Sequence, residues 1–159
     1  MQRRNVVALL GTFLFGGGSM LQRALAALGQ QAPTQAMAAV ADTLFPGGDG
    51  LPAASALGLD RRVLAMPDLR SSIGKGIAWL DRYAASRGAA SFAALDEAAR
   101  LSALDAAFAS SDEGIRPFVF TLRQHIGLAY YSEPAVKRAF AYTGPPQPDG
   151  FADFQERPR

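Results

Sequence analysis

The chain has no cysteine and a single histidine among its 159 residues. Without cysteine it cannot form disulfides, thiolate zinc sites, cysteine-ligated iron–sulfur clusters or a covalently attached c-type haem. β-Branched residues are also few, whereas alanine and leucine dominate. Because alanine and leucine favour helices and strands favour β-branched residues, the composition predicts an all-α fold. At this length a single compact domain with its own core is expected.

The chain also has little net charge. It contains 16 Lys and Arg against 14 Asp and Glu, a formal net charge of +2. Arg3, Arg4 and Arg23 lie in a segment without acids, and without them the remaining chain has 13 basic and 14 acidic residues. No cluster of lysines with interleaved aromatic residues occurs in the sequence. Nucleic acid is therefore not an expected partner.

Residues 1–26 have the pattern of an export signal. Arg3 and Arg4 precede a short apolar run, and Ala24-Leu25-Ala26 has the A-x-A form of a cleavage site. The paired arginines before a weakly hydrophobic core favour the twin-arginine route, which carries folded proteins, although Gln2 stands where Ser or Thr is usual. An uncleaved membrane anchor is the alternative, but the apolar core has roughly ten residues against the ~20 that a spanning helix needs. A periplasmic location is expected.

Residues 34–144 are expected to form the helical domain, because apolar residues recur there at helical spacing. Thr34 is the expected cap of a helix that ends near Phe45, and the glycines and prolines of 46–52 predict a tight turn. Gly74 and Gly76 interrupt the next long helix and predict close helix–helix packing. The expected buried side chains are Met37, Val40, Ala41, Leu44, Leu57, Leu59, Val63, Leu64, Leu69, Ile73, Ile77, Leu80, Ala84, Phe92, Leu95, Leu101, Leu104, Phe108, Phe118, Leu122, Ile126 and Ala129.

The end of the chain combines aromatic residues with prolines. Ser132 is the expected cap of a short helix that has Pro134 in its first turn and Gly144 at its C-terminal end. Three prolines follow within four positions and forbid further helix, so the tail 145–159 is expected to be extended. The prolines are Pro145, Pro146 and Pro148.

Aromatic and proline residues concentrated in a segment with few charges are typical of protein interfaces. For Tyr130, Tyr131 and Phe140 the alternative is burial in the domain's own core, and the sequence does not decide between the two. For the tail an interface is favoured, since proline-rich segments bind in grooves at low ordering cost. The candidate partner-binding residues are Tyr130, Tyr131, Pro134, Tyr142, Gly144, Pro145, Pro146, Pro148, Gly150 and Phe151.

Catalytic motifs are missing from the sequence. His125 has Thr121 and Ala129 at helical i−4 and i+4, so no carboxylate partner adjoins it. Neither a G-x-S-x-G elbow nor a G-x-G-x-x-G fingerprint occurs. The adjacent acids at 96–97 and 112–113 suit helix starts better than acid–base catalysis. We therefore predict no catalytic, cofactor or metal residues, and a hydrolase that uses His125 is the remaining enzymatic alternative.

The run YYSEPAVKRAFAYTGPPQPDGF, together with ADTLFPGGDGLP at 41–52, resembles the gluconate 2-dehydrogenase small-subunit (subunit 3) family, over roughly positions 34–155. The resemblance implies a small subunit without a redox group that accompanies a large FAD-dependent dehydrogenase subunit, commonly with a membrane-anchored multihaem cytochrome c subunit. Such complexes oxidise sugars, polyols or sugar acids in the periplasm. The twin arginines would then let the twin-arginine export machinery carry the flavoprotein as a passenger. A stand-alone periplasmic helical binding protein or an assembly factor is the alternative.

Overall fold

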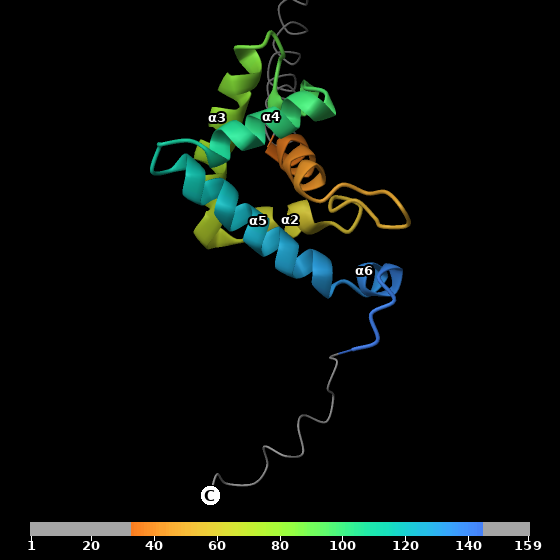
Figure 1. Ribbon diagram of the computed structural model, residues 1–159. Helices are drawn as coiled ribbons and strands as arrows, with labels where there is room; N and C mark the ends of the chain where they lie inside the picture. The colour runs from red at the N-terminus through yellow and green to blue at the C-terminus, as the bar shows by residue number, and fades with distance from the viewer. Residues whose placement is uncertain (1–32, 145–159) are drawn as a thin grey trace, which may run out of the picture.

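Helix α5 (Ile115–Ser132) runs across the described part of the molecule and contacts α2, α3, α4 and α6 (Figure 1). The computed structural model describes residues 33–144, so the predicted signal segment 1–26 and the predicted extended tail 145–159 lie outside the described residues. A helix covers 33–44, and an isolated bridge between Gly48 and Leu51 is the nearest approach to a strand within 33–144. The all-α prediction is confirmed. The other helices are α2 (Leu59–Leu64), η1 (Pro67–Leu69), α3 (Arg70–Ala85), η2 (Phe92–Ala94), α4 (Glu97–Phe108) and α6 (Pro134–Ala139).

Helix α5 starts at Ile115, just after the acids Asp112 and Glu113 that predicted a helix start. The Gly114 N–H donates to Asp112 Oδ1 at 2.8 Å, and Pro117 falls in the first turn of the helix, where its missing N–H has no intrahelical partner to lose. One face of α5 then enters the core, as its apolar spacing predicted. The buried residues of that face are Ile115, Phe118, Val119, Leu122, Ile126, Gly127 and Tyr130.

Close packing of α3 against α5 depends on a glycine. A Cβ atom built on Gly76 would lie 2.1 Å from Cε1 of Phe118, which is itself only 3% exposed. The predicted close approach is therefore confirmed at Gly76. It is wrong at Gly74, where a Cβ atom would meet nothing within 4 Å. The stripe of α3 residues that faces the core consists of Ile73, Ile77, Leu80 and Ala84, as predicted.

The turn between the first helix and α2 is held by side chains as well as by backbone. Gly48 and Leu51 exchange two backbone hydrogen bonds of 3.0 and 2.8 Å. The carboxylate of Asp42 accepts from both the N–H and the hydroxyl of Ser55, at 2.8 and 2.7 Å. The predicted tight turn at 46–52 is therefore confirmed, and it brings the following segment back onto the first helix.

Before α6, one predicted helix start and one predicted buried residue are wrong. Thr34 is itself helical and so is not the cap of its helix. Before α4, Asp96 is the cap, and its side chain accepts from the Ala99 N–H; Ser91 precedes only the short 3₁₀ turn η2. Leu101 is 53% exposed, because α4 faces the core with its alanines Ala103 and Ala107 and turns Leu101 outward.

The ends of α6 differ from the prediction for physical reasons. Ser132 is the last residue of α5, and its hydroxyl donates to the Leu128 carbonyl instead of capping α6. Pro134 forces the residue before it out of the helical region, so Glu133 is extended and becomes the N-cap of α6. At the other end the helix closes at Ala141, with φ of 49°, before the chain reaches Gly144. The Tyr142 N–H donates to the Lys137 carbonyl there, in the pattern of a Schellman motif.

Candidate functional site: an exposed aromatic surface on α5 and α6

The adjacent residues Tyr130 and Tyr131 point in different directions from the end of α5. Tyr130 is buried, 3% exposed, and its hydroxyl donates to the Pro52 carbonyl at 2.9 Å. Its ring stacks on Phe45 with a centroid separation of 5.2 Å. Burial, and to a smaller extent the neighbouring Tyr131, raise the pKa of the Tyr130 hydroxyl above its ordinary value. Tyr130 therefore belongs to the core of the domain and joins α5 to the turn before α2.

Tyr131, by contrast, is 57% exposed. Its ring is surrounded by three others, with centroid separations of 5.5 Å to Tyr130, 6.1 Å to Phe45 and 6.2 Å to Phe140. The contacts to Tyr130 and Phe45 have edge-to-face geometry, which aromatic pairs favour. Tyr131 is thus an exposed aromatic side chain with a well-supported position.

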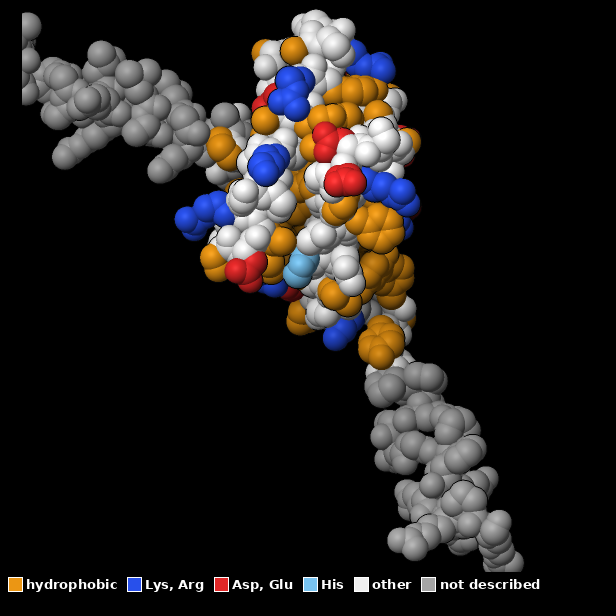
Figure 2. Space-filling model, turned by 90° about the vertical axis from the view of Figure 1, so that its left-hand side faces the viewer, with side chains coloured by type: hydrophobic (Ala, Val, Ile, Leu, Met, Phe, Trp, Pro, Cys, Tyr) orange, Lys and Arg blue, Asp and Glu red, His pale blue; other side chains and the backbone are white. Residues whose placement is uncertain are grey.

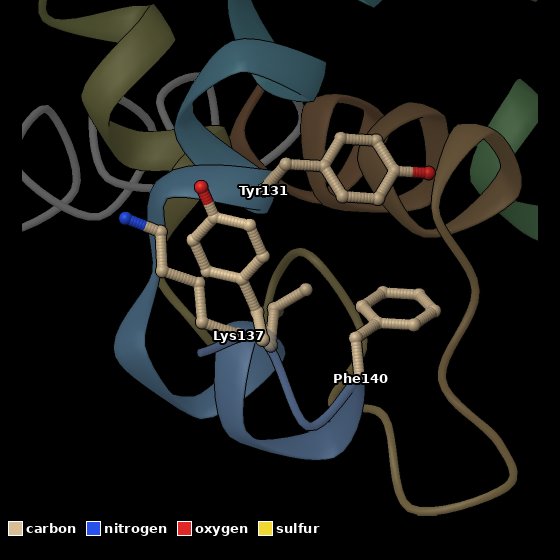
Figure 3. Close-up of a pocket in the computed structure, with 5 residues that line it drawn as sticks. Tyr131, Lys137 and Phe140 are labelled. Carbon is tan, nitrogen blue, oxygen red and sulfur yellow. The ribbon is translucent and has the colours of Figure 1, made fainter. Parts of the chain in front are cut away.

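An open groove of about 430 Å³ lies between the end of α5 and α6. Figure 3 shows the Tyr131 and Phe140 rings projecting toward the same side of this groove, with Lys137 reaching along its other side. Tyr142, just beyond α6, completes the exposed lining and Val136 lies at the base. We call this hollow the α6 groove.

A second groove of about 590 Å³ follows the outer face of α5, and Tyr131 lines it too. A Cβ atom on Gly127 would come within 3.0 Å of the Phe45 ring, so the glycine lets this ring lie against the helix. We call the hollow the α5 groove, and the two grooves together the aromatic surface. Figure 2 shows hydrophobic side chains gathered along the edge of the molecule that leads to the end of the described chain. The α5 groove is lined by Phe45, Phe120, Arg123, Gln124, Gly127, Leu128, Tyr131 and Ser132.

Comparison with known proteins assigns the described domain to a family. The family model described as gluconate 2-dehydrogenase subunit 3 matches residues 31–145, which include both grooves and all the described helices. The chain belongs to the gluconate 2-dehydrogenase subunit 3 family. Members of this family are subunits of a dehydrogenase complex, so the chain is of the accessory-subunit kind. No curated protein and no solved structure matches it.

The other predicted site residues of this subunit are dispersed. His125 is exposed on α5 and lines neither groove, and Pro134 is exposed at the start of α6. Gly144 is the last described residue. Within 33–144, no three His, Asp or Glu side chains come together as a metal site requires, and no helix is long and apolar enough to cross a bilayer. The residues outside the described range are Arg3, Arg4, Pro145, Pro146, Pro148, Gly150 and Phe151.

On α5, sequence reasoning identified Tyr131 as a candidate interface residue but missed the rest of the aromatic surface. Phe120, Leu128 and Tyr131 are more than half exposed and lie eight and three positions apart, on the side of α5 roughly opposite its buried face. A helix with apolar residues on two sides has more apolar surface than one core can cover. That second stripe, read beside the buried one, is the signal by which the α5 groove could have been found.

Proposed function

We propose that the chain is the non-catalytic small subunit of a periplasmic FAD-dependent dehydrogenase complex that acts on sugars or sugar acids of the gluconate type. In this proposal the small subunit is needed for assembly and twin-arginine export of the flavoprotein subunit. The observation that carries the proposal is the family match over residues 31–145, which coincides with a domain that exposes an aromatic surface on α5 and α6.

Energetic reasoning supports a protein partner. Five large apolar side chains of the aromatic surface are more than half exposed, and soluble monomers seldom leave such side chains next to one another in water. Tyrosine is among the residues that contribute most often to the energetic centre of an interface, and phenylalanine is enriched in interfaces as a whole. The exposed side chains are Phe120, Leu128, Tyr131, Phe140 and Tyr142.

The proposal assigns the redox chemistry of the complex to the other subunits. FAD and the substrate site belong to the large subunit, and electrons leave through a multihaem cytochrome c subunit where one is present. The small subunit holds no cofactor of its own in this proposal. Its contribution is structural: it covers an apolar region of the flavoprotein and supplies the export signal with Arg3 and Arg4 for the folded pair.

Copurification tests the complex. The tagged full-length chain, produced in its native host and recovered from the periplasm, should carry a flavin absorption spectrum near one flavin per chain. A colourless protein that elutes alone would contradict the proposal and would favour a stand-alone periplasmic protein.

Export is tested separately. Replacing Arg3 and Arg4 by lysines, which keeps the charge but removes the paired guanidinium groups, should leave the dehydrogenase activity of the large subunit in the cytoplasm. A variant with Arg23→Lys serves as the matched control and should export normally. If the Lys-Lys variant still places the activity in the periplasm, the passenger mechanism is wrong even where the complex exists.

A further inference from the structure

We infer that the aromatic surface is the docking site for the flavoprotein subunit, and that it fits a partner surface with protruding apolar side chains bordered by acidic groups. This inference rests on the proposed function and adds to it the location of the interface and the chemistry of the partner. Three features of the described chain lead to it: the segregation of charge, the position of the cations, and the placement of Tyr131 between the grooves.

Charge is divided unevenly along the described chain. Residues 115–144, which form α5, α6 and the end of the described chain, contain four Lys and Arg but only one acid. That acid, Glu133, forms an ion pair of 2.7 Å with Arg62 of α2 and is 19% exposed at its side chain. Residues 33–114 contain seven Lys and Arg and ten acids. The α5–α6 side is therefore basic on a domain that is otherwise acidic.

Two of these cations lie within the aromatic surface. Arg123 lines the α5 groove and Lys137 lines the α6 groove, and both side chains are exposed. Within 33–144 neither of them takes part in an ion pair. Cations on the border of an apolar centre raise the association rate with an acidic partner and disfavour other orientations. A partner that carries carboxylates around an apolar patch satisfies both parts of the surface.

Tyr131 occupies the centre of this arrangement because it lines both grooves. Its position is fixed by the rings of Phe45, Tyr130 and Phe140, so little side-chain freedom remains to be lost on binding. Interface residues with the largest effects are aromatic, central and well packed. Tyr131 is consequently the side chain whose removal should weaken the complex most.

The same features argue against a second copy of this chain as the occupant. A symmetric dimer brings the same patch of both copies together, which would set Arg123 and Lys137 of one copy close to those of the other. Like charges facing each other across an interface disfavour association. An anionic membrane would accept the cations. Protruding protein side chains, however, fit into concave grooves better than a flat lipid surface does.

The test uses the full-length chain coexpressed with the flavoprotein subunit, with flavin bound per tagged chain and the dissociation constant as readouts. Tyr131→Ala should raise the dissociation constant at least tenfold, whereas Tyr131→Phe should stay within about threefold. Leu101→Ala is the matched control, because Leu101 is similarly exposed (53%) but lies outside both grooves. Circular dichroism verifies that each variant is folded. If Tyr131→Ala binds as wild type does, or Leu101→Ala weakens binding equally, the assignment is overturned.

A second set of variants tests whether the cations of the aromatic surface attract an acidic partner. The double variant Arg123→Glu/Lys137→Glu should lower the association rate constant at least tenfold at low salt and flatten its salt dependence, while Lys75→Glu on α3 should change it less than threefold. If the double variant and Lys75→Glu changed the association rate constant equally, the acidic-partner assignment would be overturned.

The remaining outcomes separate the possible occupants. A wild-type chain that carries no flavin contradicts the proposed function itself, whereas a flavin complex insensitive to every groove variant contradicts only this inference. A wild-type dimer that Tyr131→Ala converts to monomer, seen by light scattering, would assign the surface to a second copy instead. Binding of the isolated chain to phosphatidylglycerol–phosphatidylcholine vesicles that Tyr131→Ala abolishes would assign it to lipid.

Discussion

Two glycines that lie two positions apart in α3 should respond to alanine in opposite directions. Gly74 and Gly76 occupy the same helix, Arg70–Ala85, so the intrinsic helical gain from alanine is about the same at both, ~1 kcal/mol. Their surroundings differ. A Cβ atom at Gly74 meets open space, whereas one at Gly76 would lie between 2.1 and 2.3 Å from three atoms of the Phe118 ring.

The size of each effect follows from these distances. Gly74→Ala should raise the free energy of unfolding by about 0.5–1 kcal/mol, because nothing opposes the helical gain. At Gly76 the Phe118 ring would have to move by more than an ångström to reach an ordinary carbon–carbon contact of about 3.5 Å. Phe118 is 3% exposed in the core, and overpacking of this kind costs typically 1–3 kcal/mol and occasionally more. With a shift this large we expect the upper part of that range, a net loss of about 1–2 kcal/mol.

Urea denaturation of the protein, followed by far-UV circular dichroism, measures both variants against wild type. The expected separation between them is about 2–3 kcal/mol, which is well above the error of such comparisons. A Gly76→Ala/Phe118→Leu double variant should recover part of the loss, because leucine is smaller than the ring it replaces. Equal stabilisation by both alanines would refute the argument that Gly76 is required by close packing of α3 on α5.

Three further substitutions have expected outcomes that urea denaturation can measure. Ala141→Gly should stabilise the domain by up to about 1 kcal/mol, because an L-residue at φ 49° is strained and glycine is not; Ala139→Gly, inside α6, should destabilise it by a similar amount. Asp42→Ala should cost about 1–3 kcal/mol, since it removes both hydrogen bonds to Ser55, whereas Asp42→Asn should cost less. Tyr130→Phe should cost about 1–2 kcal/mol near pH 8, because it leaves the carbonyl that accepts from the Tyr130 hydroxyl without its partner. Because the pKa of Tyr130 is higher in the folded chain, this advantage of wild type should be complete below pH about 10 and decline as the pH rises through the raised pKa. An advantage that stays constant up to pH 11 would contradict this explanation.

The helices could be predicted because their spacing reflects burial directly. In α3 every fourth or third residue from Ile73 to Ala84 is apolar and buried, and Pro67 opens the preceding turn as its missing N–H allows. The end of each helix was harder to predict, because several residues compete to terminate it. Ser132 can cap a new helix or bond back to its own, and Pro134 decided the outcome by making Glu133 extended.

The rotation of a helix about its axis was the other limit. In α4 the sequence places Leu101 three positions before Leu104, which suggests a shared face. The structure packs α4 through Ala103 and Ala107, on the other side of Leu104, because small side chains allow a close approach to the neighbouring helices. Spacing gives the width of an apolar face but not which of its edges a neighbour covers. The α5 groove was missed for a different reason, because Phe120 and Leu128 form a second apolar stripe on the side of α5 opposite its buried face.

Tyr130 and Tyr131 show why core and surface could not be separated from the sequence alone. Two adjacent residues of a helix are rotated by about 100°, so an aromatic pair at the border of a buried face has one ring on each side of that border. Here the buried ring is fixed by Phe45 and by a hydrogen bond to Pro52, and it supports the exposed ring at 5.5 Å. A loss of Tyr130 should therefore disturb the position of Tyr131 as well as the stability of the domain. Under the proposed assembly, Tyr130→Ala should weaken partner binding even in molecules that remain folded, whereas Tyr130→Phe should preserve it.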